Sequence, residues 1–339
     1  MNEKAVPFPT PAAPLNPVGV QRKIPLAPHQ LTDRITSQSN LFTIAHYGIA
    51  HVDPASWRLS IGGMVRRPGE LSLDDIRRLP KKFVESFHQC AGFPRRPDIP
   101  TRRIANVVWG GVDLSELLSA ADIDPKAKFL WSSGLDRGSY DNLHGGYYQK
   151  DMPLERLAQG GVLLAYEIND ETLTPEHGYP LRLIIPGYYG TNSVKWLYKL
   201  ELADKRAESI FTTILYNDPV SDSPTGAKYP LWDAPPESAI VFPESESVLP
   251  RDRVEIWGWA WAAKGIARVE ISVDGGTTWA AASIENRSQW SWQRFMFCWM
   301  PTDSGPAEII ARAVDATGIT QPESQTRNAV HRVTIEIAA

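Results

Sequence analysis

The pattern of apolar residues changes near residue 235, and this change constrains the fold more than any other feature of the sequence. Beyond the loop-like stretch 230–238, residues 254–259, 269–273 and 290–293 alternate between apolar and polar side chains. Such alternation is typical of strands with one buried face, and Asp274-Gly275-Gly276 marks a turn after the second run. Short strands at this spacing over about 100 residues predict an immunoglobulin-like β-sandwich.

Six tryptophans lie between residues 257 and 292, which is more than the core of one sandwich usually requires. Tryptophan is enriched where protein surfaces meet. We therefore expect some of the six to face another domain or subunit, and packing inside the sandwich core is the alternative.

The preceding part of the chain mixes strand and helix patterns without regular alternation of the two. A capped helix begins at Ser72 and ends before Pro80. Strand-like runs occupy residues 57–61, 83–88, 129–132, 162–167, 181–186 and 194–202, and helix-like runs occupy residues 112–121 and 152–158. This mixture predicts an α+β domain rather than a doubly wound sheet.

The length of 339 residues is enough for about two domains. Seven prolines in residues 1–30 favour extended backbone at the beginning of the chain. We predict an N-terminal proline-rich arm at residues 1–40, an α+β domain at residues 41–235 and the sandwich at residues 236–339.

Charge and hydropathy bound the partners and the location. The formal net charge of -4 provides no basic field, so we expect no nucleic-acid partner. No run of about 18 apolar residues is present that would span a membrane. Proline-broken sequence after Met1 lacks the apolar segment of a secretory signal. The expected location is cytoplasmic if Met1 is the true start, and periplasmic if a signal peptide was removed.

The two cysteines have different surroundings. Cys298 lies in the apolar run 295–299, which predicts a buried thiol. Cys90 follows a strand-like run and begins a loop that contains glycine, proline, Arg95 and Arg96. Two guanidinium groups nearby in sequence favour the thiolate, so Cys90 is a candidate metal ligand or nucleophile.

A nucleophilic cysteine would need a base. His46, His88 and His177 are each candidates for that base, so the residues alone leave a cysteine hydrolase open.

The segment His88-Gln89-Cys90-Ala91-Gly92 resembles the Cys-Ala-Gly signature of the sulfite oxidase family, in which the cysteine binds molybdenum beside the two dithiolene sulfurs of molybdopterin. Further blocks similar to that family follow in its order at residues 106–112, 134–136, 163–167, 177–182, 186–187 and 193–197. Residues 272–279 resemble its dimerisation domain. The resemblance covers about residues 40–339 and implies a molybdopterin-binding catalytic domain at 41–235, followed by an immunoglobulin-like dimerisation domain and a homodimer.

The resemblance also implies a set of site residues. Cys90 would be the metal ligand and a catalytic residue, and Tyr216 and Arg95 would be catalytic residues that position substrate. The residues implied to bind the cofactor are His46, Cys90, Asp136, His177, Arg182, Ser193, Val194 and Lys195. Cationic and hydrogen-bonding side chains of this kind suit a buried phosphate, and a carboxylate such as Asp136 can accept from pterin ring nitrogens.

The family's substrate-binding arginines are only partly present. Ile44 replaces the first of them, and Pro94 replaces the first of the arginine pair, which leaves Arg95 in register. A third segment is shortened between residues 325 and 328, where Arg327 could partly substitute. Each missing charge-assisted hydrogen bond removes about 1.5–3 kcal/mol from the binding of a desolvated anion. The pocket is therefore expected to be less cationic than one built for sulfite.

These features predict a molybdenum–molybdopterin oxidoreductase that transfers an oxygen atom to or from a small molecule, with sulfite not the best substrate. The alternatives are a true sulfite oxidase or dehydrogenase, a nitrate-reductase-like enzyme, and a cofactor-binding or interaction protein without turnover. No haem domain is expected in this chain, so the electron acceptor would be external, either a carrier protein or oxygen.

Overall fold

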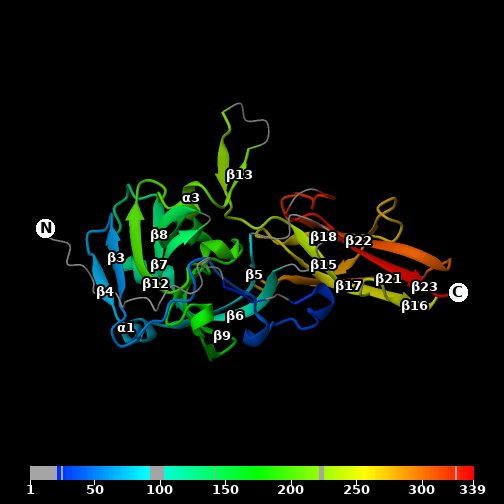
Figure 1. The fold of residues 1–339 in the computed structure, drawn as a ribbon, viewed down its shortest axis with the longest axis horizontal. Helices are drawn as coiled ribbons and strands as arrows, with labels where there is room; N and C mark the ends of the chain where they lie inside the picture. The colour runs from blue at the N-terminus through cyan, green and yellow to red at the C-terminus, as the bar shows by residue number, and fades with distance from the viewer. Residues whose placement is uncertain (1–20, 24–25, 92–102, 141, 221–224, 325–326) are drawn as a thin grey trace.

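The computed structural model describes residues 21–23, 26–91, 103–140, 142–220, 225–324 and 327–339. The chain forms two β-rich units that lie end to end, with the first unit containing a few short helices and the second consisting of strands (Figure 1). The α+β domain and the immunoglobulin-like sandwich are thereby confirmed. None of the helices in the described residues is long and apolar enough to cross a membrane.

Two sheets build the first unit. One has the order β10-β9-β6-β5, with β11 also paired to β9, and the other has the order β4-β3-β12-β7-β8. The strands of the first sheet are β5 (Lys81–Gln89), β6 (Ile104–Asp113), β9 (Leu163–Ile168), β10 (Glu171–Thr172) and β11 (Arg182–Ile184). Those of the second are β3 (Leu59–Gly63), β4 (Gly69–Leu71), β7 (Phe129–Tyr140), β8 (Leu143–Pro153) and β12 (Leu197–Ala203). All pairs are antiparallel except β3 with β12.

Short helices connect these strands. The helices are α1 (Leu73–Arg77), α2 (Leu114–Ser119) and α3 (Ile210–Thr213), and the 3₁₀ turns are η1 (Pro28–Gln30), η2 (Gln38–Asn40), η3 (Leu154–Gln159), η4 (Pro175–His177) and η5 (Gly190–Asn192). The predicted cap at Ser72 is confirmed, because its hydroxyl accepts from the backbone of Asp75 at 3.1 Å. The predicted helix at 152–158 is only a 3₁₀ turn, because β8 continues through Pro153.

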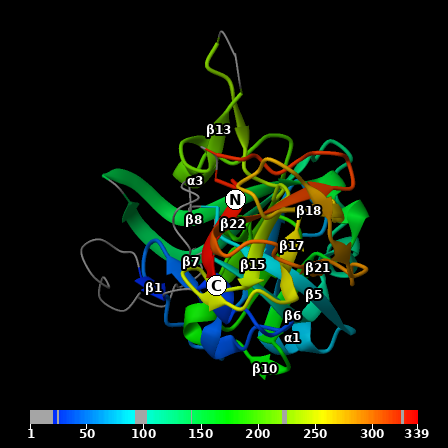
Figure 2. The same cartoon turned by 90° about the vertical axis from the view of Figure 1, so that its right-hand side faces the viewer.

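Two further strand pairs border the first unit. The strands β1 (Gln21–Lys23) and β2 (Thr43–Ala45) form one pair, and β13 (Asn217–Pro219) and β14 (Lys228–Pro230) form the other. The segment that contains β13 projects from the body of the molecule in both ribbon views (Figures 1 and 2).

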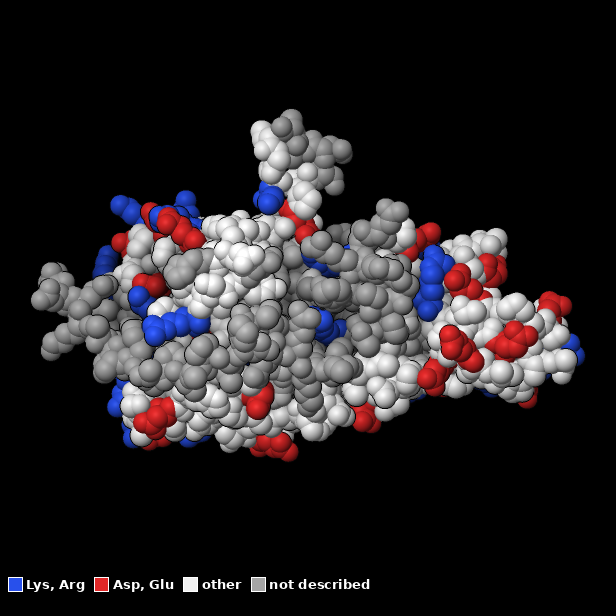
Figure 3. All heavy atoms as spheres, in the orientation of Figure 1, with Lys and Arg blue, Asp and Glu red and all other residues white. Residues whose placement is uncertain are grey.

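The second unit packs two sheets face to face. Their orders are β15-β17-β21-β20 and β16-β23-β22-β18-β19. The first sheet consists of β15 (Glu237–Phe242), β17 (Val254–Trp261), β20 (Ser283–Ile284) and β21 (Gln293–Trp299). The second consists of β16 (Val248–Leu249), β18 (Ile266–Ser272), β19 (Ala280–Ala281), β22 (Gly305–Asp315) and β23 (His331–Ile337). On the face drawn in Figure 3, Asp and Glu side chains are prominent over this unit.

Two predictions about β21 were wrong. The strand begins at Gln293, and the backbone of Trp290 instead pairs with the first unit through Phe87 N to Trp290 O and Trp290 N to Glu85 O, both 3.1 Å. Cys298 is exposed, because Phe297 and Trp299 face the sandwich core and the alternation of the strand turns Cys298 outward. Its Sγ accepts from Arg253 Nη2 at 3.2 Å.

At least four of the six tryptophans contact the first unit, Trp290 among them with its ring centroid 4.7 Å from the Arg156 guanidinium, which confirms that some face another domain. The side chains of Trp259, Trp261 and Trp292 are buried in one cluster with Phe87 of β5. The ring nitrogen of Trp259 donates to Leu31 O at 2.7 Å, and that of Trp292 donates to Arg34 O at 3.0 Å. The sandwich therefore supports both β5 and the end of the N-terminal segment.

Candidate functional site

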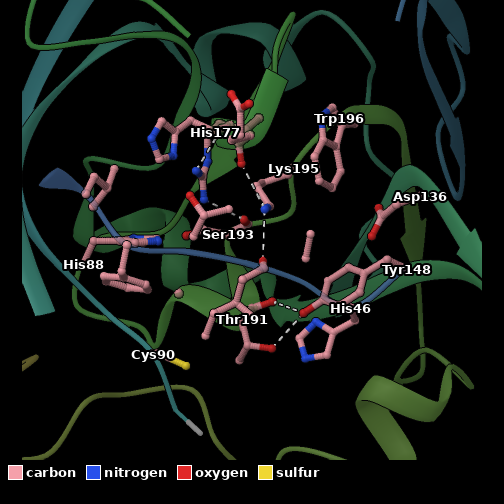
Figure 4. Close-up of a pocket in the computed structure, with 18 of the residues that line it drawn as sticks. His46, His88, Cys90, Asp136, Tyr148, His177, Thr191, Ser193, Lys195 and Trp196 are labelled. Atoms are coloured by element: carbon pink, nitrogen blue, oxygen red, sulfur yellow. Dashed lines mark hydrogen bonds between the residues drawn. The ribbon is translucent and has the colours of Figure 1, made fainter. Parts of the chain in front are cut away.

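A pocket of about 680 Å³, its opening to solvent included, lies in the first unit (Figure 4). Its lining comes from β2, the end of β5, β7, β8, β11 and the turns η4 and η5. The predicted site residues that line it are His46, Cys90, Asp136, His177, Arg182, Ser193, Lys195 and Tyr216. Residues from seven separate parts of the chain thus meet in one place.

Two predicted site residues are not among those lining residues. The side chain of Val194 is 1% exposed and packs into the core of the first unit. Only the backbone of Val194 lies near the pocket, between the lining residues Ser193 and Lys195. Arg95 lies outside the described residues.

The end of β5 positions Cys90. The ladder with β6 continues past Gln89, because Cys90 N donates to Arg103 O at 3.0 Å. Alternation along the strand points Gln89 into the interface between the units, where its side chain accepts from Trp261 Nε1 at 3.0 Å and donates to Glu237. His88 and Cys90 therefore face the pocket together, and the sandwich holds the strand that presents them.

The wall opposite Cys90 is cationic (Figure 4). Arg182 is 3% exposed, and its Nη1 and Nη2 donate to His177 O at 3.0 Å and Ser193 O at 3.1 Å. Its Nε is buried without a hydrogen-bond partner among the described residues. Burial lowers the pKa of Arg182 to about 9. Because these partners are neutral carbonyls, the charge of the guanidinium is not compensated by them.

Lys195 adds a second cation to this wall. Its ammonium donates to Ile44 O at 3.0 Å and Glu176 O at 3.2 Å, which are again backbone carbonyls. Desolvation and the neighbouring Arg182 lower the pKa of Lys195. Two cations forced together in a pocket make the binding of an anion favourable.

Asp136 reaches the pocket at an irregularity in β7, where the register with β8 shifts between Ser133 and Arg137. Burial raises the pKa of Asp136, and the charge of Lys195 opposes that rise. Gly134 is required for this geometry, because a Cβ there would lie 2.6 Å from both Asp136 Oδ1 and Lys195 O. The carboxyl group can therefore serve as an acceptor or, when protonated, as a donor.

Tyr216 and His46 meet on another side of the pocket. The Tyr216 hydroxyl lies 2.6 Å from His46 Nε2. The imidazole is surrounded by the rings of Tyr140, Tyr148 and Phe211, with centroids 5.0–5.7 Å away. Burial raises the pKa of Tyr216 far above its usual range, so its hydroxyl stays protonated and can donate.

Sequence reasoning assigned no role in the pocket lining to Tyr148, Thr191 or Gly190, which also line it. The Tyr148 hydroxyl donates to Thr191 O at 2.8 Å. Gly190 has no room for a side chain, because a Cβ would lie 2.8 Å from His88 Nε2. These residues come from β8 and η5, and nothing in their local sequence indicates that they approach Cys90.

From the sequence we considered His88 only as a possible base. Its position in the pocket could have been predicted from its spacing, because it stands two residues before Cys90 on the same strand. Burial lowers the pKa of His88 well below its usual range, and Arg182 contributes to the shift. The imidazole therefore stays neutral, packed edge-on against Trp109 at 5.5 Å between ring centroids.

Arg327 does not replace a substrate arginine. Its guanidinium forms a two-point ion pair with Asp218 at 2.6 and 3.0 Å and is not among the pocket-lining residues. Its charge is therefore compensated away from the pocket. Within the described part of the chain, no group of three or more His, Cys, Asp or Glu side chains could hold a metal ion by itself.

Comparison with known proteins gives two family matches. Residues 46–211 match the family described as "Oxidoreductase molybdopterin binding domain", and residues 228–336 match the "Mo-co oxidoreductase dimerisation domain". The pocket residues from His46 to Trp196 fall within the first match, and the sandwich strands fall largely within the second.

Individual proteins extend these matches over most of the chain. Sulfite oxidase of Arabidopsis thaliana is 32% identical over 309 residues, which cover 79% of this chain and 77% of that protein. Mitochondrial sulfite oxidase of Mus musculus is 31% identical, covering 91% of this chain and 63% of the mouse protein. The solved structure of the sulfane dehydrogenase SoxCD from Paracoccus pantotrophus superposes with a TM-score of 0.80 at 27% identity, covering 100% of this chain and 95% of the other.

Proposed function

The chain belongs to the sulfite oxidase family of molybdopterin-binding oxidoreductases, and we propose that it transfers an oxygen atom to or from a small molecule at a molybdenum held by Cys90. The family match makes it an oxidoreductase enzyme with a molybdopterin-binding domain. The direction of transfer and the substrate are part of the proposal.

The pocket residues fit the cofactor, and the uncompensated charge of Arg182 is the observation that carries this proposal. A guanidinium that is 3% exposed and donates, within the described part of the chain, only to carbonyls is costly unless an anion binds beside it. The phosphate of molybdopterin is such an anion. Lys195, His177 and Ser193 would bind the same phosphate. The hydroxyl of Thr43 is buried without a hydrogen-bond partner among the described residues, and it offers one more hydrogen-bonding group.

The remaining residues divide into two roles. Asp136 would accept from pterin ring nitrogens, and Cys90 would supply one thiolate to the metal. When bound, the cofactor supplies a two-electron centre for oxygen-atom transfer. Tyr216 would donate a hydrogen bond to the reacting oxygen from a position fixed by His46, which needs no reorganisation during the reaction.

The substrate is proposed to carry less negative charge than sulfite. Ile44 lines the pocket where sulfite oxidases have an arginine, and Arg327 is paired with Asp218. Arg95 is proposed to position the substrate, as its register in the sequence implies. In the oxidative direction water provides the oxygen, and two electrons and two protons leave, the electrons passing to an external carrier protein or to oxygen.

The proposal is tested by metal analysis and kinetics on the chain purified from a host that makes the cofactor. We expect molybdenum close to one per chain, and less than about a tenth per chain would contradict the enzymatic role and favour a cofactor-free interaction protein. With sulfite and an artificial acceptor, a kcat/KM of about 10⁴–10⁸ M⁻¹s⁻¹ would identify sulfite as a good substrate and contradict the charge argument.

A further inference from the structure

The two residues on either side of Cys90 are held by the sandwich. Alternation at the end of β5 turns the side chains of Gln89 and Ala91 away from the pocket, and they are 4% and 3% exposed. Ala91 packs in one cluster with Trp259 and Trp261 of β17. The amide oxygen of Gln89 accepts from the ring nitrogen of Trp261 at 3.0 Å. The proposed metal ligand therefore stands between two residues that the other unit anchors.

Glu237, the first residue of β15, is the second partner of Gln89. Its side chain is fully buried, and its carboxylate accepts from Gln89 Nε2. The indole of Trp261 can only donate and an ionised carboxylate can only accept, so the two partners hold the Gln89 amide in one orientation. A hydrogen bond to a charged acceptor is stronger than one between neutral groups, above all where water is excluded. The residue before Cys90 is thereby fixed at both ends of its side chain.

The same carboxylate lies beside another part of the pocket wall. Burial raises the pKa of Tyr189 well above its usual range, the charge of Glu237 adds to the rise, and the charge of Arg327 opposes it. Tyr189 directly precedes Gly190 of η5, and a Cβ on Gly190 would lie 3.1 Å from Gln89 O. The turn η5 and the end of β5 thus pack on each other, and Glu237 is close to both.

We infer that Glu237 of the sandwich is a positioning residue for Cys90, and that it fixes the direction of the thiolate by holding Gln89. The inference rests on the proposed function, because it takes Cys90 as the metal ligand. Hydrogen bonds in the shell behind a metal ligand orient that ligand and tune the metal. The sandwich thus acts on the site of its own chain, besides the dimerisation that its family match indicates.

The test uses the molybdenum-loaded enzyme and the electron paramagnetic resonance spectrum of its one-electron-reduced metal, because this spectrum depends on the directions of the ligands. It is recorded for wild type, Glu237→Ala and Glu237→Gln. We expect shifted g-values in Glu237→Ala, together with a kcat about 10- to 100-fold lower. Glu237→Gln should retain the wild-type spectrum, because its amide oxygen can still accept from Gln89.

Ser238→Ala is the matched control. Ser238 is the next residue of β15 and is also fully buried, but its hydroxyl bonds within the sandwich, to Ala311 O at 3.0 Å and to Gln321 Oε1 at 2.8 Å. Its loss should lower the melting temperature and leave the spectrum unchanged. A wild-type spectrum in Glu237→Ala would overturn the inference. An equal shift in Ser238→Ala would also overturn it, because any loosening of the sandwich would then have the same effect.

A second measurement needs no cofactor. In a Cys298→Ser background Cys90 is the only cysteine, so the rate of its alkylation by iodoacetamide reports how firmly the end of β5 is held. We expect Glu237→Ala to raise this rate about 10-fold in the folded, cofactor-free protein, and Glu237→Gln to leave it within about twofold. An unchanged rate in Glu237→Ala would contradict the inference. If Glu237→Ala does not fold, Trp261→Phe takes its place in both measurements with the same expected results, because it removes the other partner of Gln89 and keeps a ring.

Molybdenum content separates the two possible failures. A wild-type chain purified without molybdenum contradicts the proposed function. A molybdenum-loaded enzyme whose spectrum and alkylation rate do not depend on Glu237 contradicts only the inference about that residue.

Discussion

The hydroxyl of Tyr216 lies 2.6 Å from Nε2 of His46, inside a cluster of aromatic rings that closes one side of the pocket. The two residues are 170 positions apart in the chain and meet because the residue after β2 and the segment that follows α3 both line the cavity. The aromatic rings hold the imidazole of His46 in one orientation. The hydrogen bond to the imidazole then holds the hydroxyl of Tyr216 in place. This pair gives the site one donor whose direction does not depend on the substrate.

Replacing Tyr216 with phenylalanine should lower kcat and leave the fold nearly unchanged. The ring stays, so only the hydroxyl that would stabilise developing charge is lost. We expect a decrease in kcat of about 10²-fold, with stability reduced by no more than about 1.5 kcal/mol. Steady-state kinetics and thermal unfolding measure the two effects. Tyr198→Phe is the control, because Tyr198 is half-buried against Tyr147 outside the pocket, and an equal loss in both variants would exclude a special role for Tyr216.

Replacing Lys195 with methionine should reduce the molybdenum content more than tenfold, as expected from the loss of a charge-assisted bond worth about 1.5–3 kcal/mol to a phosphate. The cofactor-free variant should melt at the same temperature as the cofactor-free wild type or higher, because the variant lacks a desolvated cation whose hydrogen bonds, among the described residues, go to backbone carbonyls and not to an acidic side chain. Lys199→Met on β12 is the control, since Lys199 pairs with Glu201 at 2.9 Å outside the pocket. Full molybdenum loading of Lys195→Met would show that this lysine does not hold the cofactor.

Stability should depend on pH through Lys150, which is 1% exposed and whose ammonium donates to Phe211 O at 2.6 Å. Burial lowers the pKa of Lys150 to about 7. Below that pH both folded and unfolded chains bind the proton, and the full cost of the buried charge is present. Between about pH 7 and 10.5 only the unfolded chain keeps the proton, so stability rises with pH.

The measurement for Lys150 is urea unfolding of the cofactor-free protein from pH 6 to 10. Over this range the free energy of unfolding of wild type should increase relative to that of Lys150→Met. The difference between the two proteins should change by about 1.4 kcal/mol for each unit of pH, which amounts to a few kcal/mol in total. Parallel curves for the two proteins would show that Lys150 does not titrate within this range.

Dimerisation should depend on the outer face of the β15-β17-β21 sheet. Met296, Met300 and Phe242 are 37%, 60% and 41% exposed on or beside that face, whereas the outer face of the other sheet carries ion pairs such as Arg312 with Glu270. We expect Met296→Lys combined with Met300→Lys to convert a homodimer into monomers in light scattering. Thr334→Lys on β23 should leave the dimer intact, and a dimer that survives the double variant would place the interface elsewhere.

Parts of this site could be predicted from the sequence because they lie in ordered motifs. Cys90, His177 and Lys195 stand in contiguous blocks that resemble the family, and the structure brings them into one pocket. Tyr148 could not be found this way, because the turn η5 brings Thr191 to its hydroxyl over a separation of 43 residues.

The errors in the sandwich have a similar cause. An apolar run such as 295–299 does not show which of its alternating faces is covered, so Cys298 was expected to be buried. The backbone of Trp290 pairs with β5 of the first unit, a contact that no local pattern encodes. The local sequence therefore predicted where strands form better than it predicted which of their faces are buried and which unit they contact.

The claim that Cys90 binds the metal is tested most directly by X-ray absorption spectroscopy at the molybdenum edge. Wild type should show about three sulfur neighbours of molybdenum, two from the dithiolene and one from the protein, and Cys90→Ser should show about two. Cys298→Ser should match wild type, because Cys298 is an exposed residue of the sandwich. An unchanged number of sulfur neighbours in molybdenum-loaded Cys90→Ser would contradict the account.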